Sequence, residues 1–253
     1  MFKMTSINAL TALSALTTAL VLPISASAVP FTIDNIETKG FVCDSAAPPS
    51  GDGALNCPAG TTPDIIEWRQ GDADVSSLVL TSLTPVTGIN PGDPAVRINQ
   101  LTHNNDVIPS AFSFSIDIAN TIQVTDENGG AIVLTDTNAI TISFTETQNQ
   151  DPCTFDNPAG SICDDFFDFD AGGLAPVAFT AGGLNYLLIF GLEPGDGAVL
   201  VGNRVYTAEN QSSHLFVTAQ IIAQPTQIPE PISLALLGLG LLGIGFTLRH
   251  RKM

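Results

Sequence analysis

The chain has 253 residues, of which 44% are hydrophobic and 13% are charged, and its formal net charge at pH 7 is −17. This composition is typical of a globular protein with a sizeable core and argues against a disordered chain. Acidic surfaces repel nucleic acid, so nucleic acid is not an expected partner.

The first 28 residues have the features of an export signal. Lys3 provides a positively charged start, an apolar stretch follows, and the small residues Ala-Ser-Ala stand directly before Val29. We therefore predict a signal peptide over residues 1–28, which signal peptidase removes. An uncleaved N-terminal anchor fits less well, because Thr and Ser interrupt the apolar stretch.

Four cysteines follow, and the oxidising compartments outside the cytoplasm favour their pairing. Cys43 and Cys57 lie close in sequence, as do Cys153 and Cys163, so we predict two local disulfides that close loops rich in proline and glycine. The other two connectivities stay open. Zinc is a weaker alternative, because the spacings exceed those of CxxC knuckles. The segment 44–63 reads as a loop.

The body, residues 29–227, alternates apolar and polar side chains with period two, and its turns are rich in Gly, Pro, Asn and Asp. Strands are predicted at residues 76–83, 111–124, 139–146, 184–191, 198–207 and 214–223. Residues 127–131 read as a turn by composition. No long window of the body has a helical period. This pattern predicts an all-β body, arranged as an antiparallel β-sandwich in which each sheet buries one face.

One polar group that could carry chemistry is Thr102-His103-Asn104-Asn105, which is expected just before a strand. These side chains could bind a ligand or a metal, or they could cap a turn through hydrogen bonds to the backbone. We favour turn capping. A metal at His103 would require His214 and nearby carboxylates to converge on it.

A second group consists of Asp164, Asp165, Asp168 and Asp170. Calcium takes six to eight oxygen ligands, so a calcium site is one interpretation of this group. The other is the solvated face of a strand, since Asp168 and Asp170 alternate with phenylalanine and no EF-hand loop is present. We favour the solvated face and predict no cofactor, with Ca²⁺ as the open alternative.

An enzymatic role is not expected. Catalysis by a serine, histidine and aspartate would have to use His103 or His214, and no GxSxG sequence is present. Carboxylates are so numerous that no particular pair indicates a glycosidase. One tryptophan and two tyrosines offer little stacking surface for sugars.

Near the C-terminus, Pro229-Glu230-Pro231 forms a stiff and extended segment. Each proline fixes its own φ and disfavours helix in the residue before it. Such an extended peptide is the form in which processing enzymes usually take their substrates.

An apolar stretch and a basic end follow this tripeptide. Residues 232–248 carry no charge, and as a helix of about 25 Å they can cross a bilayer. Arg249, Arg251 and Lys252 come next, and positive residues keep a chain end in the cytoplasm. We therefore predict one C-terminal transmembrane helix, with the body outside.

This arrangement, in a chain that begins with an export signal, closely resembles the PEP-CTERM sorting signal of Gram-negative bacteria. The resemblance assigns residues 228–253 to sorting and anchoring. It implies that an exosortase, a membrane cysteine protease or transpeptidase, recognises Pro229, Glu230 and Pro231 and removes the anchor. The protein would be held transiently in the inner membrane and then pass to the cell envelope or the extracellular matrix.

The body carries a second resemblance. Trp68, the sequence THNN from Thr102, a strand rich in Phe and Ser, residues 143–147 and a cysteine-bearing loop occur in an order similar to that of the THxN family of PEP-CTERM proteins. This family implies no activity. The sequence thus predicts a structural protein of the surface or of an extracellular matrix rich in exopolysaccharide, as in biofilms. The alternative is an adhesive envelope module that binds calcium or exopolysaccharide.

Overall fold

The computed structural model describes a body built almost entirely of β-strands. The described residues are 30–43, 54–58, 61–69, 75–108, 111–134, 140–149 and 151–224. Within them the chain forms fifteen strands, one short 3-10 helix, η2 (Ala171–Leu174), and no α-helix. No helix in these ranges has the length and apolar character needed to cross a membrane. The predicted export signal and the predicted span 232–248 lie outside the described residues.

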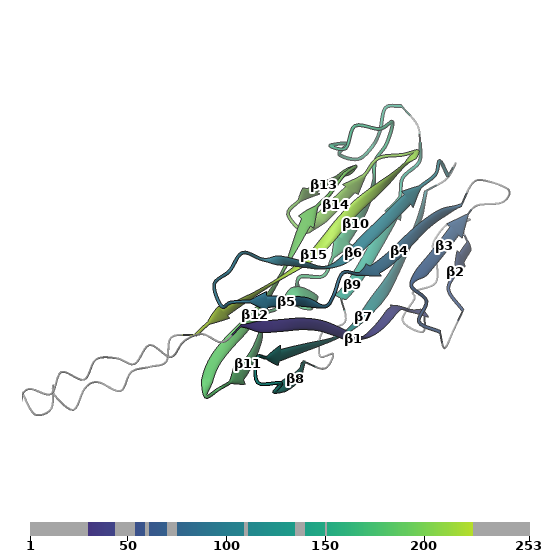
Figure 1. Ribbon diagram of the computed structural model, residues 1–253. Helices are drawn as coiled ribbons and strands as arrows, with labels where there is room; N and C mark the ends of the chain where they lie inside the picture. The colour runs from purple at the N-terminus through teal and green to yellow at the C-terminus, as the bar shows by residue number, and fades with distance from the viewer. Residues whose placement is uncertain are drawn as a thin grey trace, which may run out of the picture.

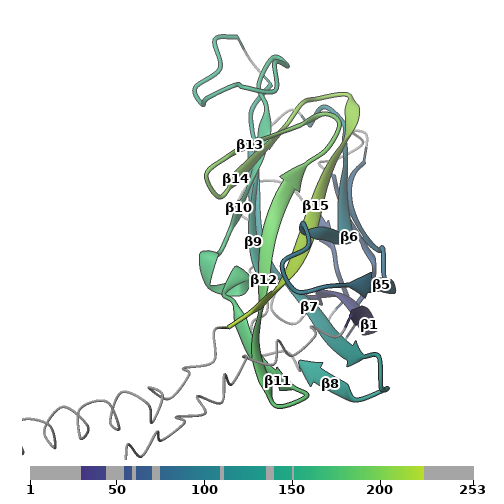
Figure 2. The same cartoon turned by 60° about the vertical axis from the view of Figure 1, so that its left-hand side comes forward.

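The strands form two antiparallel sheets, which appear as two layers in Figures 1 and 2. The first sheet has the order β13-β14-β10-β9-β7-β1-β5, with β8 paired to β7. Its strands are β1 (Phe31–Val42), β5 (Val86–Ile89), β7 (Phe112–Asp126), β8 (Ala131–Leu134), β9 (Ile140–Glu146), β10 (Asp165–Phe169), β13 (Ala198–Val201) and β14 (Arg204–Thr207).

The second sheet has the order β11-β12-β15-β6-β4-β3-β2. Its strands are β2 (Ala54–Asn56), β3 (Ile65–Arg69), β4 (Ser76–Ser82), β6 (Val96–Asn105), β11 (Val177–Ala181), β12 (Leu184–Pro194) and β15 (Gln211–Ala223). Long central strands such as β6 and β15 pair on both sides, so their backbone hydrogen bonds are satisfied within the sheet. The prediction of an all-β body with antiparallel sheets is confirmed.

Period-two alternation explains why these segments form strands. In β7 the apolar side chains at alternate positions from Phe112 to Ile118 are buried, while the polar ones between them are partly exposed. Strand β9 pairs with β7 so that Phe144 lies opposite Phe114 and Ile142 opposite Ile116. Such cross-strand apolar pairs are the main stabilising contacts of a sheet.

Two clusters of buried side chains lie between the sheets. In the first, Trp68 of β3 packs against Phe114 and Phe144 of the other sheet, with ring centroids 5.2 and 4.6 Å apart. In the second, Phe31 of β1 packs against Tyr186 of β12 at 5.0 Å. Burying one large apolar side chain stabilises a fold by about 1.5–3 kcal/mol, so these contacts hold the two sheets face to face.

Both ends of the described chain leave the body at the same end. Phe31, at the start of β1, contacts Tyr186, and Tyr186 pairs with Ala223 at the end of β15. The connection between β9 and β10 projects from the opposite end of the molecule, as Figures 1 and 2 show. The end of β15 therefore lies far from the β9–β10 connection.

Two sequence predictions differ from the structure. The segment 44–63 contains a short strand, β2, whose Leu55 lies opposite Trp68 on β3. Three residues are too few for a period-two pattern, so the proline and glycine around them dominated the prediction. The predicted strand 198–207 is a hairpin of β13 and β14, because Gly202 adopts a φ of 65° and turns the chain.

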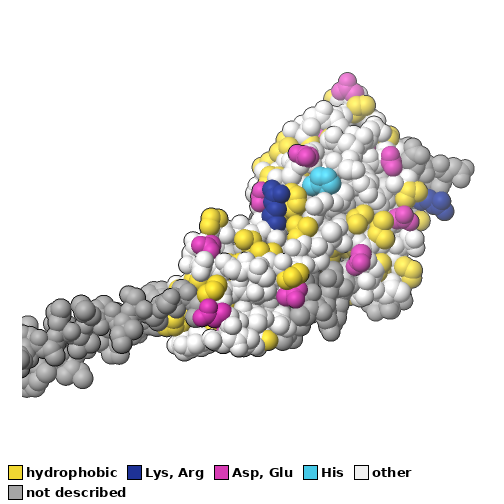
Figure 3. Space-filling model, viewed as in Figure 1, with side chains coloured by type: hydrophobic (Ala, Val, Ile, Leu, Met, Phe, Trp, Pro, Cys, Tyr) yellow, Lys and Arg dark blue, Asp and Glu magenta, His cyan; other side chains and the backbone are white. Residues whose placement is uncertain are grey.

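On one face of the body the acidic side chains stand singly. On the face seen in Figure 3, magenta side chains are spread among neutral and apolar ones, and the described residues form no large basic patch there. Two of the few basic residues are paired, Arg97 with Glu193 at 2.6 Å and Arg204 with Asp168 at 2.7 Å. On this face the negative charge is therefore distributed instead of concentrated at one exposed site.

Candidate functional site

The THNN sequence lies inside β6, in the middle of the second sheet, and not before a strand. Thr102 and Asn104 point away from the core, and Asn104 bonds side chains on both neighbouring strands at 3.0 and 2.7 Å. His103 and Asn105 point inward and are buried. The turn-capping interpretation was wrong, because these polar side chains bond across strands instead of closing a turn.

His103 is enclosed by aromatic rings. Its ring stacks on Trp68 at 5.4 Å and meets the edges of Phe144 and Phe167 at 5.4 and 5.0 Å. Its Nδ1 shares a hydrogen bond of 2.9 Å with the hydroxyl of Thr207. Burial lowers the pKa of His103 to about 3, so the side chain is neutral at physiological pH. It acts as a polar member of the core.

His214 does not join His103 at a metal site. It lies opposite Thr102 on the neighbouring strand β15, and its Nδ1 is 3.2 Å from the Thr102 hydroxyl. Side chains alternate between the two faces of a strand, so His214 and Thr102 occupy the face opposite to that of His103. The convergence that a histidine metal site requires is absent for this pair.

Three carboxylates meet instead at the end of the body that carries the β9–β10 connection. Glu146 ends β9, Asp165 starts the antiparallel strand β10, and Glu209 follows β14. One oxygen of each lies within 4.8 Å of one oxygen of the others. The register explains the encounter, because Phe167 pairs with Phe144 and the next inward positions are Asp165 and Glu146. We call this group the carboxylate cluster.

Neutral donors hold one oxygen of each of the two innermost carboxylates. The indole Nε1 of Trp68 donates to Glu146 Oε2 at 3.1 Å, and the backbone N–H of Thr147 donates to Asp165 Oδ1 at 2.6 Å. Glu146 and Asp165 are fully buried, and Glu209 is half-buried. No Lys or Arg of the described chain forms an ion pair with any of the three.

This environment raises the pKa of all three carboxyl groups. Burial is the largest cause for Glu146, followed by the charge of Asp165. Burial also raises the pKa of Asp165, against the hydrogen bond from Thr147 that lowers it. For Glu209, burial comes first and the charge of Asp165 second. Buried like charges disfavour ionisation, so the cluster favours binding of protons or of a cation.

Two amide side chains line the same cluster. Asn105 contacts both Asp165 and Glu209, and Asn149 contacts Glu209. Their Nδ2 groups donate elsewhere, to the carbonyls of Ala208 (3.3 Å) and Ile108 (3.4 Å). Their Oδ1 atoms are buried and receive no hydrogen bond. Each amide therefore places a buried oxygen without a partner beside the cluster, and hydrogen bonding by Asn105 lowers the pKa of Asp165 and Glu209 against the larger effect of burial.

Both predicted disulfides are confirmed. Cys43 bonds to Cys57 and Cys153 bonds to Cys163, which close segments with sequence separations of 14 and 10. The described chain contains no free cysteine. A zinc site built on these thiols is therefore ruled out, because all four sulfur atoms are used in disulfides.

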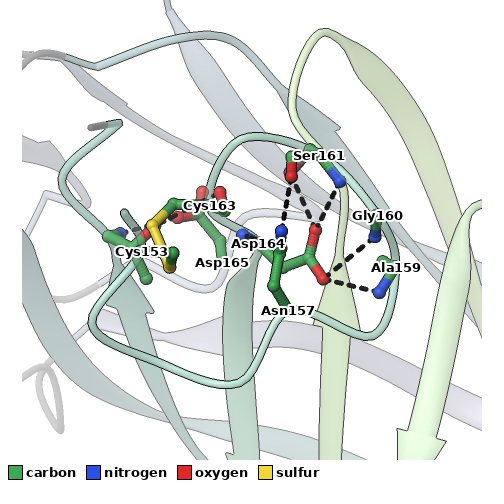
Figure 4. Close-up of a disulfide and its surroundings, with 9 residues drawn as sticks. Cys153, Asn157, Ala159, Gly160, Ser161, Cys163, Asp164 and Asp165 are labelled. Atoms are coloured by element: carbon green, nitrogen blue, oxygen red, sulfur yellow. Dashed lines mark hydrogen bonds between the residues drawn. A yellow bond between two sulfur atoms is a disulfide. The ribbon is translucent and has the colours of Figure 1, made fainter. Parts of the chain in front are cut away.

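Asp164 organises the loop inside the second disulfide (Figure 4). Its carboxylate accepts hydrogen bonds from the backbone N–H groups of Ala159, Gly160 and Ser161 and from the Ser161 hydroxyl. Asp164 is fully buried, and these donors compensate for the loss of water. The carboxylate thus stabilises the loop and is not available as an exposed ligand.

The four aspartates predicted as one group do not come together. Asp164 stabilises the disulfide loop, and Asp165 belongs to the carboxylate cluster. Asp168 forms a bidentate pair with Arg204 at 2.7 and 2.8 Å, and Asp170 is exposed. The solvated-face interpretation fits Asp168 and Asp170 but is wrong for Asp164 and Asp165, because Asp165 and Asp168 lie on opposite faces of β10 and Asp164 is buried in the disulfide loop.

A surface pocket leads to the carboxylate cluster. It has a volume of about 530 Å³ and is lined by Val107, Asn149, Gly160, Ser161, Ile162, Glu209 and Asn210. Gly160, Ser161 and Ile162 belong to the disulfide loop, which forms one wall. The pocket therefore borders Glu209 and Asn149, although the side-chain oxygens of both residues are buried.

Sequence reasoning did not identify Glu146, Glu209 and Asn149. Glu146 had a visible signal, because the period of Ile140, Ile142 and Phe144 places it on the buried face of β9. An acidic residue at a buried position is unusual unless it is paired. Glu209 and Asn149 lie outside the strands and had no comparable pattern.

Comparison with known protein families supports the predicted C-terminal sorting signal. Residues 227–252 match the PEP-CTERM protein-sorting motif. The match includes Pro229, Glu230 and Pro231, and it differs by one residue at each end from the predicted segment 228–253. The motif implies exosortase-dependent sorting of an exported, membrane-associated protein. A search of the curated proteins finds no significant match.

Proposed function

We propose that this chain is an exported structural protein of the cell surface or extracellular matrix, delivered by an exosortase and without enzymatic activity. The observation that carries the proposal is the sorting motif at residues 227–252, which begins three positions after the described body ends at Gln224. An N-terminal signal peptide over residues 1–28 and a temporary membrane helix over 232–248 complete this route. The body would belong to the THxN-like proteins.

The body has properties that suit a protein outside the cell. Both disulfides close short segments, and each such closure stabilises a fold by about 2–3 kcal/mol in the chain-entropy model. Disulfides persist in oxidising compartments and support small domains there. The acidic surface also resists association with other acidic polymers, which favours a dispersed component of a hydrated matrix.

The geometry of the body supports anchoring through its C-terminal end. The end of β15 and the start of β1 lie at one end of the body, and the disulfide loop lies at the other. A body held through residues that follow β15 would therefore point its disulfide loop and carboxylate cluster away from the membrane.

The side chains near the cluster do not suit catalysis. His103, which would have to act as the base, is neutral and enclosed by aromatic rings. Glu146 and Asp165 are fully buried, so a polymer substrate cannot reach them. These observations support a structural role over a hydrolytic one.

The test is a double substitution of both prolines of the motif, Pro229→Ala with Pro231→Ala, in the producing bacterium. We expect the variant to accumulate in the inner membrane with residues 232–253 intact, as judged by fractionation and mass spectrometry of the C-terminus. The matched control is Pro225→Ala, which changes a proline just outside the matched motif. Normal release and trimming of the double variant would contradict the sorting proposal.

The matrix role needs a separate measurement. We expect the trimmed wild-type protein in the matrix fraction, and a matrix that is weaker or less abundant when the gene is deleted. Recovery of all the protein from the culture supernatant, with an unchanged matrix in the deletion strain, would contradict the structural role while leaving the sorting route intact.

A further inference from the structure

The carboxylate cluster and its two amides present oxygen atoms without hydrogen-bond donors. Six buried side-chain oxygens lack a partner: Asn105 Oδ1, Glu146 Oε1, Asn149 Oδ1, Asp165 Oδ2 and both carboxylate oxygens of Glu209. An unpaired buried acceptor costs about 1–3 kcal/mol, and more when the group is charged. Six in one place are too many to be incidental, since native folds satisfy nearly all buried polar groups.

Asn105 provides an observation that is independent of the acidic residues. Its side chain is only 2% exposed and contacts both Asp165 and Glu209. Its Nδ2 donates to the Ala208 carbonyl, which leaves the Oδ1 acceptor unpaired. The Asn105 Oδ1 can accept a hydrogen bond from a protonated carboxyl group or coordinate a cation, and the experiment below separates these two states.

We propose that these five side chains, Asn105, Glu146, Asn149, Asp165 and Glu209, form a calcium-binding site. Calcium binds six to eight oxygens, from carboxylates and amide carbonyls, at 2.3–2.6 Å. Two ligand oxygens on one ion are therefore at most about 5 Å apart, and the three carboxylate oxygens lie within 4.8 Å of one another. Zinc would favour His and Cys ligands, and the described cysteines are all in disulfides.

The electrostatics of the site favour a divalent cation. The two innermost carboxylates are fully buried, and no basic side chain of the described chain pairs with the cluster. A calcium ion supplies the missing positive charge at the point where the acceptors converge. The alternative is that Glu146 and Asp165 share a proton, and the experiment below separates the two states.

The surroundings of the site allow an ion to enter and then hold the ligands in place. The pocket beside Glu209 and Asn149 lies between solvent and the buried oxygens of these two residues, and one of its walls is the loop closed by Cys153–Cys163, so an ion enters by a small movement of these side chains. Trp68 and Thr147 each fix one oxygen of an inner carboxylate and leave the other free. All five ligands belong to the body, so the proposal does not depend on the sorting route.

The first test uses the purified full chain and two probes, Ca²⁺ and Tb³⁺. The melting temperature is measured first in the presence of a chelator and then again after Ca²⁺ is added. At 100 times its Kd, we expect Ca²⁺ to raise the melting temperature by about 5–10 °C. Trp68 is the single tryptophan of the chain and donates a hydrogen bond to Glu146, so exciting it should sensitise the emission of bound Tb³⁺. Added Ca²⁺ should then displace Tb³⁺ and abolish this emission.

The decisive variant is Glu209→Gln, with Glu193→Gln as its matched control. Glu193 forms an exposed pair with Arg97 far from the cluster. In chelator, E209Q should melt at or above the wild-type temperature, because one repelling buried carboxylate is gone. In Ca²⁺ it should lose at least half of the stabilisation and most of the Tb³⁺ emission. A residue with only a structural role would lower the melting temperature in both conditions.

Three results would overturn the proposal. The first is a wild-type melting temperature that does not respond to chelator or to millimolar Ca²⁺, which would assign the cluster to shared protons. The second is an E209Q variant that keeps the full response to Ca²⁺, which would place binding elsewhere. The third is an equal response to Mg²⁺ and Ca²⁺ at the same concentration, which would exclude a site selective for calcium.

Discussion

The indole N–H of Trp68 on β3 donates to Glu146 Oε2 on β9 at 3.1 Å, across the interface between the two sheets. The two residues are 78 positions apart in the chain. The contact joins the aromatic core to the carboxylate cluster, because the same indole ring packs on Phe114, Phe144 and His103.

Trp68→Phe keeps an aromatic ring at this position but removes the donor. The Glu146 carboxyl then loses the indole hydrogen bond at its Oε2, so we expect the free energy of unfolding to fall by about 1–3 kcal/mol. Urea denaturation followed by circular dichroism measures this change. In the background of Glu146→Leu the same substitution should cost less, since the acceptor is absent. Equal costs in both backgrounds would show that packing alone explains the effect.

His103 should be required for packing and not for its charge. His103→Ala leaves a cavity among Trp68, Phe144 and Phe167, and truncating a buried aromatic side chain costs about 3–5 kcal/mol. His103→Phe fills the cavity and loses only the Thr207 hydrogen bond, so it should cost clearly less. Thermal unfolding of the two variants provides the comparison. An alanine variant as stable as the phenylalanine variant would contradict this view of the core.

The two disulfides should stabilise the fold similarly but differ in their effect on ion binding. Replacing either pair with serine should lower the free energy of unfolding by about 2–3 kcal/mol, because the closed segments are of similar length. Only loss of Cys153–Cys163 should weaken calcium binding, since that loop lines the pocket. Calcium titration of both double-serine variants checks this. Equal calcium affinities of the two variants would show that the disulfide loop does not contribute to the calcium site.

Gly40 occupies a position in β1 that no other residue should tolerate. It has a φ of 66°, and an added Cβ would collide with the backbone carbonyl of Pro63. Gly88 has a similar φ of 73° but open space around it. Gly88→Ala should therefore cost about 1–2 kcal/mol from backbone strain alone, and Gly40→Ala considerably more. Chemical denaturation of both variants tests the difference, and equal costs would refute the steric argument.

The sequence contained enough information to predict strands β4, β7, β9, β12 and β15 and both disulfides, but it did not single out β1, β3, β5, β6, β8 or β11. Period-two alternation identified β7 and β9, because their inward and outward faces differ in polarity along their length. Proximity in the chain identified both cysteine pairs. Alternation failed for β2, which is too short, and for β13 and β14, where a glycine turn interrupts a continuous apolar segment.

The carboxylate cluster depends on contacts that sequence spacing does not reveal. Glu146 and Asp165 are 19 positions apart and meet because β9 and β10 are antiparallel neighbours in register. Asn105 approaches them from the other sheet, so no local pattern could group it with them. The four aspartates were grouped in the sequence analysis because they are close in the chain. In the structure they do not lie together, since successive positions on β10 face opposite sides of the sheet.

The sequence by itself determined that this protein carries a sorting motif of exported proteins. A sorting motif is recognised as a short linear segment, so residues 227–252 can be identified from the sequence without knowledge of the fold. The tertiary structure decided which polar residues act together in the body. Burial and strand register brought three carboxylates together with two amides. Buried oxygens without a partner cost free energy, and this cost is the reason to propose an ion at the cluster.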